Sequence, residues 1–263
     1  MTELITFISN NFILFLLLVV RTTGIFVAAP VFSRSTFPAL LKIGLSVAIA
    51  FILLPIVGRD FIIEADNLLI LIGYSINEFL IGIIIGFISF TYFSVLYLAG
   101  TIIDTQMGFG MVNVFDPQTN AQIPVMGNFY NNVVSMLFIV VNGHHLLIRA
   151  LVYSYNLLPV GFSLSINSDG VTLMTRIMTE MFIMAIKFAA PVLVVILLST
   201  ILLGVLARTM PQMNVFIVGI PLKIAVGIIS VIITLQYIVP FSNRLFDRMF
   251  SAILEMMKIL ARG

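Results

Sequence analysis

The feature that most constrains this chain is a series of long apolar stretches separated only by short polar connectors. The stretch 68–98 is longer than a plain membrane span, and comparable runs cover 4–31, 174–206 and 215–239. A helix needs about 20 mainly apolar residues to cross a bilayer. Charged residues make up only 9% of the 263 residues, whereas a soluble domain has about 25%. The sequence therefore predicts an all-α integral membrane protein built from long, kinked helices and helical hairpins.

The remaining apolar segments are shorter and occupy the middle of the chain. The segments are 40–54, 126–141 and 146–158, and the polar connectors are 59–67, 159–170 and 208–214. Proline lacks the backbone N–H that a helix interior uses. The segment 40–54 is therefore expected to close at Pro55 and Gly58.

The N-terminal run predicts a retained first helix rather than a signal peptide. It lacks a basic region at its start, contains Arg21, and is followed directly by Pro30. A cleavable signal normally has a basic beginning and a small-residue cleavage site. Insertion into a membrane that faces the cytoplasm fits this pattern best.

The distribution of Lys and Arg leaves the membrane topology open. Cytoplasmic loops normally concentrate these residues. Six alternating spans would put the basic C-terminal tail on the side of the acidic connector 59–67, and opposite Arg34, Lys42 and Arg208. Either some stretches do not span, or the helices do not sit in lipid as ordinary spans.

The C-terminal tail 240–263 has the pattern of an amphipathic helix. Apolar residues recur at helical spacing, and basic residues occupy the opposite face. The apolar positions are Leu245, Phe246, Met249, Phe250, Ile253, Met256, Met257 and Leu260. The tail is expected to lie on a membrane surface or to pack on a partner.

The stretch 101–130 interrupts the apolar sequence and is expected to connect two helices. Gly108 and Gly110 make its backbone permissive, and Asp116-Pro117 provides a turn. An ordinary exposed loop is polar, yet this one carries the large apolar side chains Phe109, Met111, Val112 and Phe115. A segment that is both permissive and apolar suits packing inside a protein cavity better than exposure to water.

Four charged residues lie inside apolar stretches: Arg21, Glu78, Lys187 and Lys223. A charge at a helix centre costs about 2.5–3.5 kcal/mol on insertion scales, so such residues usually face protein or a water-filled cavity. They are expected to pair internally, with Glu78 bound to Arg21 or Lys223, or to line an aqueous pathway. Helices of this kind are poorly suited to standing alone in lipid, so an oligomer is implied.

Enzyme chemistry is not expected. The chain has no cysteine, and His144-His145 lack the intervening glutamate and helical spacing of a membrane metallopeptidase. Gly161 and Ser163 lack the second glycine of a nucleophile elbow. No cofactor or metal is expected, and a net charge of +2 with scattered basic residues does not suggest nucleic acid as a partner.

Three separated motifs carry a resemblance to a known family. They are Arg21–Gly24 with Ala29-Pro30 and Lys42–Leu45, then Gln106–Met111 leading to Asp116-Pro117, and then Arg208–Lys223 with Gly227 beyond. Their order along the chain resembles the FliR family of membrane components of the flagellar export gate. The likeness covers essentially the whole chain, and homologues in virulence type III secretion systems are the nearest relatives of that family.

The resemblance implies a place in a helical hetero-oligomeric channel for unfolded export substrates. The partners would be FliP, FliQ, FlhB and FlhA, besides membrane lipids, in the bacterial inner membrane at the flagellar basal body. Residues 1–173 would form a FliP-like portion, 174–239 a FliQ-like hairpin and 240–263 the amphipathic tail. The residues at the hairpin tip, expected to contact partners, are Arg208, Pro211 and Asn214.

The resemblance also implies that a segment at about 106–124 is a plug that keeps the channel closed. The positions carried over to this role are Gly108, Phe109, Gly110, Met111, Val112, Phe115, Asp116 and Pro117. The alternatives are a virulence type III secretion homologue and a stand-alone secondary transporter for a small solute. Transporters often contain internal repeats, and no convincing repeat in two halves is visible here.

Overall fold

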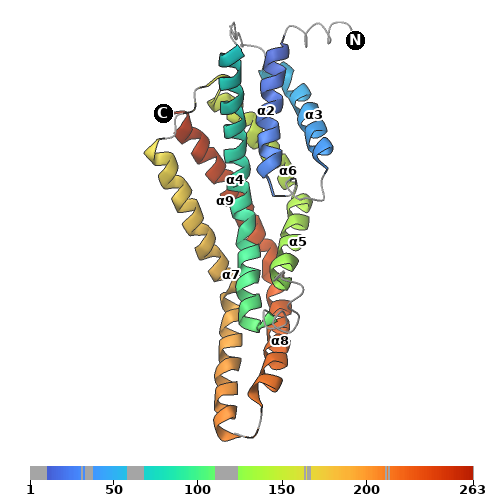
Figure 1. Cartoon of the computed structure of the whole chain (residues 1–263), viewed down its shortest axis with the longest axis vertical. Helices are drawn as coiled ribbons and strands as arrows, with labels where there is room; N and C mark the ends of the chain where they lie inside the picture. Colours follow the sequence, from blue (N-terminus) through green and yellow to red (C-terminus); the bar gives the residue numbers. More distant parts are fainter. Residues whose placement is uncertain are drawn as a thin grey trace. The chain divides into compact units, whose positions relative to one another are not determined.

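The computed structural model describes residues 11–30, 32, 38–57, 68–109, 124–162, 164, 167–210, 212 and 214–262. The regular structure within these residues is helical (Figure 1). The elements are α2 (Phe12–Ala28), α3 (Ala39–Val57), α4 (Leu68–Met107), α5 (Val125–Val140), α6 (Gly143–Leu157), α7 (Ser168–Thr209), α8 (Val215–Thr234), the 3₁₀ helix η3 (Leu235–Tyr237) and α9 (Ile238–Leu260).

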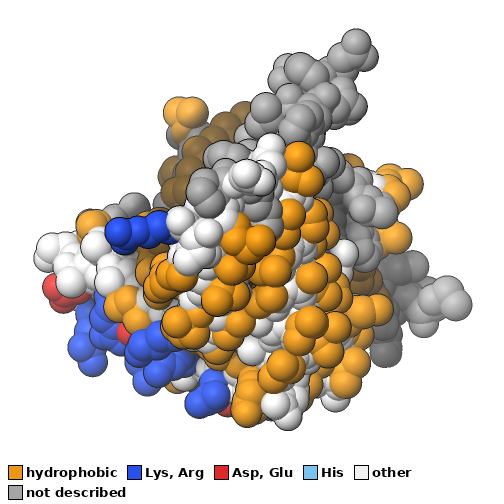
Figure 2. All heavy atoms as spheres, turned by 90° about the horizontal axis from the view of Figure 1, so that it is seen from below, with side chains coloured by type: hydrophobic (Ala, Val, Ile, Leu, Met, Phe, Trp, Pro, Cys, Tyr) orange, Lys and Arg blue, Asp and Glu red, His pale blue; other side chains and the backbone are white. Residues whose placement is uncertain are grey.

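The helices confirm the predicted class of an all-α integral membrane protein. Among the described residues, α3, α4, α7 and the run Ile217–Leu260 are long and apolar enough to cross a bilayer. The helices α5 and α6 count as a fifth candidate if together they form one broken span. Large hydrophobic side chains remain exposed along several helices, and Figure 2 shows a face covered mainly by them.

The chain divides into two compact units. The first comprises Met1–Tyr92, Asn142–Ile177 and Phe246–Gly263, and the second comprises Phe93–Val141 and Met178–Leu245. This division reflects which residues pack together. The ranges 1–173, 174–239 and 240–263 were expected instead from likeness to FliP and FliQ, which packing does not test, so they stay a prediction.

Two helix ends differ from the sequence-based expectation. Pro55 does not close the second apolar segment, because α3 continues through it to Val57. The helix α4 continues to Met107 rather than ending at 98, so the first residues of the stretch 101–130 are helical. Polar residues are compatible with this last part of α4, because the Thr101 and Thr105 hydroxyls donate to helix carbonyls of the preceding turn.

Small residues bring α2 and α4 into contact inside the first unit. A Cβ added to Gly24 would lie 2.7 Å from the carbonyl oxygen of Phe79, and one added to Gly86 would lie 2.6 Å from the Cβ of Ala28. Close approach of apolar helices requires this absence of side chains. Gly82 and Gly86 of α4 thus both lie at a helix crossing.

The apolar face of α9 is buried within this chain. In the first unit it includes Phe246, Met249, Ile253, Met256, Met257 and Leu260, which are between 0% and 3% exposed. The guanidinium of Arg176 on α7 also pairs with the carboxylate of Glu255 on α9, at 3.3 Å. The chain itself therefore covers the face for which the sequence suggested a membrane surface or a partner.

Candidate functional site at the neck of the central segment

The central segment leaves α4 and enters α5 in the second unit. Of the expected plug residues, the structure describes Gly108 and Phe109; Gly110, Met111, Val112, Phe115, Asp116 and Pro117 lie outside the described residues. We call the junction of the end of α4 with the start of α5 the neck. It is formed by residues 97–108 and 124–127.

Gly108 ends α4 in a left-handed backbone conformation. Its φ is 87°, and its N–H donates to the carbonyl oxygen of Asp104 at 3.1 Å. A glycine that follows a helix commonly adopts this conformation, which side chains disfavour. A Cβ at Gly108 would meet nothing within 4 Å, so the requirement for glycine is conformational rather than steric.

The carboxylate of Asp104 joins the two sides of the neck. Both of its oxygens accept from the N–H of Met126 at 3.0 Å, and Oδ2 also accepts from the N–H of Gly127 at 3.1 Å. These N–H groups lie in the first turn of α5, where a helix offers them no partner of its own. The side chain of Asp104 is buried, with 4% of the residue exposed. A residue of α4 thus caps α5.

The backbones of α4 and α5 also touch directly at the neck. A Cβ built on Gly100 would lie 2.5 Å from the nitrogen of Gly127 and 2.6 Å from its Cα. A Cβ built on Gly127 would lie 3.0 Å from the Thr101 hydroxyl. Gly100 of α4 thus faces Gly127 of α5, and a side chain at Gly100 would force the two helices apart.

A third helix meets the neck through Met107. This side chain, in the last turn of α4, is fully buried. It packs on α8 at Gly227, where an added Cβ would lie 2.7 Å from the Met107 Cγ. Gly227 is the glycine that follows the third sequence motif, so the structure brings part of two separated motifs together.

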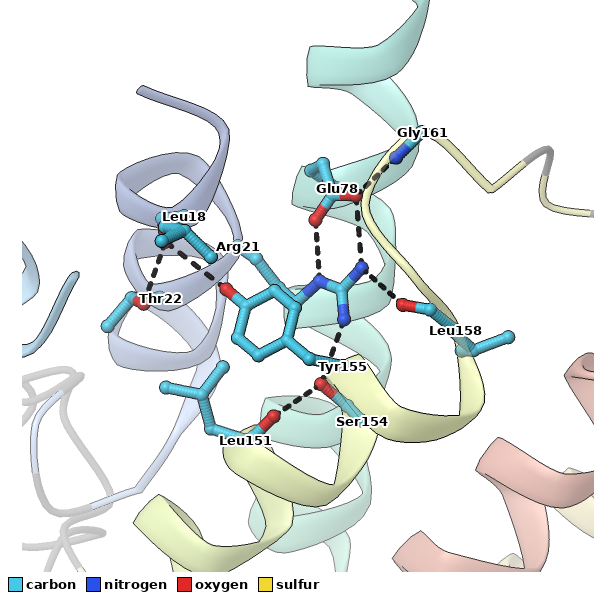
Figure 3. Close-up of polar contacts among 9 residues, drawn as sticks. All are labelled: Leu18, Arg21, Thr22, Glu78, Leu151, Ser154, Tyr155, Leu158 and Gly161. Atoms are coloured by element: carbon cyan, nitrogen blue, oxygen red, sulfur yellow. Dashed lines mark hydrogen bonds and ion pairs between the residues drawn. The ribbon is translucent and has the colours of Figure 1, made fainter. Parts of the chain in front are cut away.

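A second polar site lies in the first unit, around Arg21 (Figure 3). The Arg21 guanidinium binds both carboxylate oxygens of Glu78, through Nε at 2.5 Å and Nη2 at 3.0 Å. Its remaining donors reach the Ser154 hydroxyl at 3.0 Å and the Leu158 carbonyl at 2.9 Å. The ring of Tyr155 lies 4.0 Å from the guanidinium carbon.

This cluster ties three helices and one turn together. Arg21 belongs to α2, Glu78 to α4 and Ser154 to α6, and the Gly161 N–H donates to Glu78 at 3.3 Å. Both charged side chains are fully buried. Bidentate Arg–carboxylate geometry with further hydrogen bonds is what a buried pair needs to be stable. Of the two pairings considered for Glu78, the structure contains the one with Arg21.

The remaining sequence candidates belong to α7, α8 and the connector between them. Lys187 is exposed on α7, Lys223 is half-buried on α8, and Arg208 is exposed in the last turn of α7. Asn214 precedes α8, and its carbonyl accepts from the N–H of Ile217 at 3.1 Å. Pro211 lies outside the described residues.

The neck is a structural contact, in which hydrogen bonds and close backbone packing join α4 to α5. Within the described ranges, no group of three or more His, Asp or Glu side chains is arranged to hold a metal. The role of Asp104 was missed by sequence reasoning. An aspartate near the end of an apolar helix is the available signal, but nothing local identifies Met126 as its partner.

The fold defines an α-helical membrane protein, and comparison with known proteins defines its family. Residues 12–249 match the family described as bacterial export proteins, family 1, and the chain belongs to this family. The flagellar biosynthetic protein FliR of Bacillus subtilis (strain 168) is 34% identical over 89% of this chain and 90% of its own length.

Two further relatives come from a second flagellar system and from a translocation system. FliR of Escherichia coli (strain K12) is 30% identical over 91% of each chain. The Yop proteins translocation protein T of Yersinia pestis is 28% identical over 86% of this chain and 87% of its own length. The resemblance to the FliR family expected from the three motifs is confirmed.

Proposed function

We propose that this chain is a non-enzymatic subunit of the flagellar type III protein export gate. The observation that carries the proposal is the match over residues 12–249 to a family of bacterial export proteins, together with FliR relatives aligned over about nine-tenths of the chain. The chain would lie in the bacterial inner membrane at the flagellar basal body. With FliP and FliQ it would form the channel for unfolded flagellar proteins.

Within that channel, the segment between α4 and α5 would act as the plug. A gate must block ions and still yield to a peptide, so weak apolar packing on a permissive backbone suits it. The neck supports this assignment because it fastens both ends of the segment to one place. The apolar residues between Phe109 and Phe115 would occlude the channel, and Asp116-Pro117 would turn the chain back towards α5.

The hairpin of α7 and α8 would supply the FliQ-like part. The two helices run in opposite directions (Figure 1) and keep many large apolar side chains exposed. Such surfaces need lipid or neighbouring subunits around them. Arg208, Pro211 and Asn214 would lie at a tip available to partners, among them FlhB and, below it, FlhA.

A virulence type III secretion role is the second candidate, and the similarity to the Yersinia translocation protein favours it. Two flagellar relatives are more similar, at 34% and 30% against 28%, whereas other FliR proteins match at 26–29%. Co-purification with FliP and FliQ encoded in the same genome, together with loss of motility in a deletion strain, distinguishes the flagellar role from the virulence role. Solute uptake by the chain alone in liposomes would instead support a transporter.

Deletion of Phe109–Val112 tests the plug. The deletion should make cells leaky to ions while the export complex still assembles, because the occluding side chains are removed and the neck is kept. A deletion of equal length at Ser163–Ile166 is the matched control and should not leak. Ion conductance equal to that of the control would overturn the plug assignment.

A further inference from the structure

We propose that the charged face of α9 is a docking surface for an acidic segment of a neighbouring protein subunit. The charged face is the exposed side of α9 from Arg244 to Arg262, opposite the apolar side that this chain covers itself. The inference rests on the proposed function only in that the neighbour belongs to the export complex. The docking segment would present several Asp or Glu side chains to α9.

The exposed side of the last helical run changes character at Pro240. Before this proline, Ile232, Ile233 and Tyr237 are each at least 60% exposed. Among the described residues after it, no large hydrophobic side chain is exposed, and the exposed positions are polar or charged. A charge inside a membrane normally faces protein or a water-filled cavity. Lipid is therefore a poor neighbour for the charged face.

Within the second unit, α7 and α9 expose opposite kinds of surface at one level. The rings of Phe188 on α7 and Phe241 on α9 lie 4.8 Å apart. Two residues before Phe188, Ile186 is 53% exposed. Three residues after Phe241, Arg244 is exposed. Both positions are within about 5 Å of the ring contact along their helix axes. An apolar and a charged surface at the same level need different neighbours, which an assembly of subunits provides.

The sign of the charge on this face selects the kind of neighbour. The cations are Arg244, Arg248, Lys258 and Arg262, and the carboxylates are Asp247 and Glu255. The face therefore has an excess of two positive charges. The Glu255 carboxylate already pairs with Arg176 of α7, at 3.3 Å. Interfaces are arranged so that opposite potentials meet, and like charges suppress wrong partners. An acidic partner fits this face.

The charged face is hollowed where the end of α9 lies beside the start of α7 in the first unit. The hollow has a volume of about 420 Å³, and its charged lining consists of Asp169, Arg176, Glu255, Lys258 and Arg262. Lys258 and Arg262 are one helical turn apart, so they point to the same side of α9. Within the described part of the chain, neither cation makes an ion pair. A carboxylate that enters the hollow would meet both.

Protection of a single thiol tests this inference. The chain has no cysteine, and Ser251 is exposed on the charged face, seven residues from both Arg244 and Lys258. Ser251→Cys would be reacted with N-ethylmaleimide in the export complex purified in a neutral detergent, with cysteines of the other subunits replaced by serine. We expect alkylation about tenfold slower than in the same complex unfolded in sodium dodecyl sulfate, because the covering subunit must first open locally.

Variants of opposite sign identify the charge of the covering segment. Arg244→Glu combined with Lys258→Glu should return the alkylation rate towards that of the unfolded complex, because like charges would then face each other. Asp247→Asn removes a carboxylate from the same face and should leave the thiol protected. Arg149→Glu reverses an exposed cation of α6 and is the matched control, with no expected change. If the doubly reversed chain fails to accumulate, Arg244→Gln with Lys258→Gln should raise the rate by a smaller factor.

Three outcomes would overturn the inference. Fast alkylation of Ser251→Cys in the parent complex would show that the charged face meets water, either around the complex or along its passage. Protection that appears only after addition of phosphatidylglycerol vesicles would show that an anionic membrane surface covers the face. An unchanged rate after substitution of Arg244 and Lys258, by glutamate or by glutamine, would show that the cover is not acidic.

Co-purification separates this inference from the proposed function. If the chain does not co-purify with FliP and FliQ, the proposed function fails. If it co-purifies with them while Ser251→Cys is alkylated as fast as in the unfolded complex, only the docking surface on α9 fails.

Discussion

At the scale of single residues, each buried charge among the described residues lies beside a matched acceptor or donor. Arg21 and Glu78 are the clearest case, because two fully buried ions satisfy each other and also bind Ser154, Leu158 and Gly161. Asp104 follows the same rule with backbone N–H groups as its partners. Each of these residues is tolerated in an apolar protein because its polar atoms are paired.

Removal of one partner of the buried pair should be more harmful than removal of both. Arg21→Met should destabilise the folded chain by about 3–5 kcal/mol, because it strands the Glu78 carboxylate. Adding Glu78→Met should restore part of that loss. Membrane accumulation and thermal unfolding of the purified complex, measured for both single variants and the double variant, give the coupling between the residues. Strictly additive effects would contradict the pairing.

Gly108 should tolerate asparagine better than alanine. Its left-handed φ of 87° disfavours a side chain by about 1–2 kcal/mol, while asparagine adopts this region more readily than other residues. Flagellin export and ion leakage should therefore depart from the parent more in Gly108→Ala than in Gly108→Asn. Equal behaviour of the two variants would show that the positive φ does not matter for gating.

At the scale of helices, close contacts at glycines mark where α4 meets α2 and where it meets α5. Gly24 and Gly86 permit the α2–α4 crossing, and Gly100 with Gly127 permits the α4–α5 contact. Close backbone approach of this kind is a usual route to association of apolar helices. The last turns of α4 contact both α5 and α8.

Two glycines of α4 should respond in opposite ways to alanine. At Gly100 an added Cβ would lie 2.5–2.6 Å from backbone atoms, whereas at Gly73 it would meet nothing within 4 Å. Gly100→Ala should lower the accumulation and thermal stability of the complex. Gly73→Ala should be neutral or stabilising by up to about 1 kcal/mol, because alanine favours helix more than glycine does. Equal stability of both variants would refute the close contact.

At the scale of the whole molecule, the exposed apolar surface makes an isolated chain in water implausible. On α7 the exposed side chains include Leu197, Leu198, Ile201, Leu202 and Val205, each more than half exposed. Lipid tails and the helices of neighbouring subunits are equally apolar, so composition does not distinguish them. The proposed assembly with FliP and FliQ would cover part of this surface with protein.

A bulky apolar substitution separates lipid from protein on this surface. Leu198→Trp keeps the surface apolar, so the chain should still enter the membrane, but a packed neighbour has no room for the larger ring. We expect normal chain levels in membranes and a lower yield of co-purified FliQ. Leu198→Met, which conserves volume, is the control. An unchanged FliQ yield with tryptophan would indicate that lipid covers this position.

The sequence alone determined the class of the protein, most of its helices and its family. Length and apolarity of a stretch suffice to identify a helix in a membrane, since every backbone group there must be paired within its own segment. Three separated motifs were enough to identify the family. Element ends were less predictable, because Pro55 and the polar residues after 98 were compatible with continued helix.

Only the tertiary structure decided what each helix face meets. Arg21 finds Glu78 across 57 residues, and Asp104 finds Met126 across 22, and no local pattern encodes either partner. The periodicity of the C-terminal tail identified its apolar face, but that face is covered by this chain itself rather than by lipid or a partner. A helical pattern specifies which side chains share a face. The packing of distant segments decides what that face is buried against.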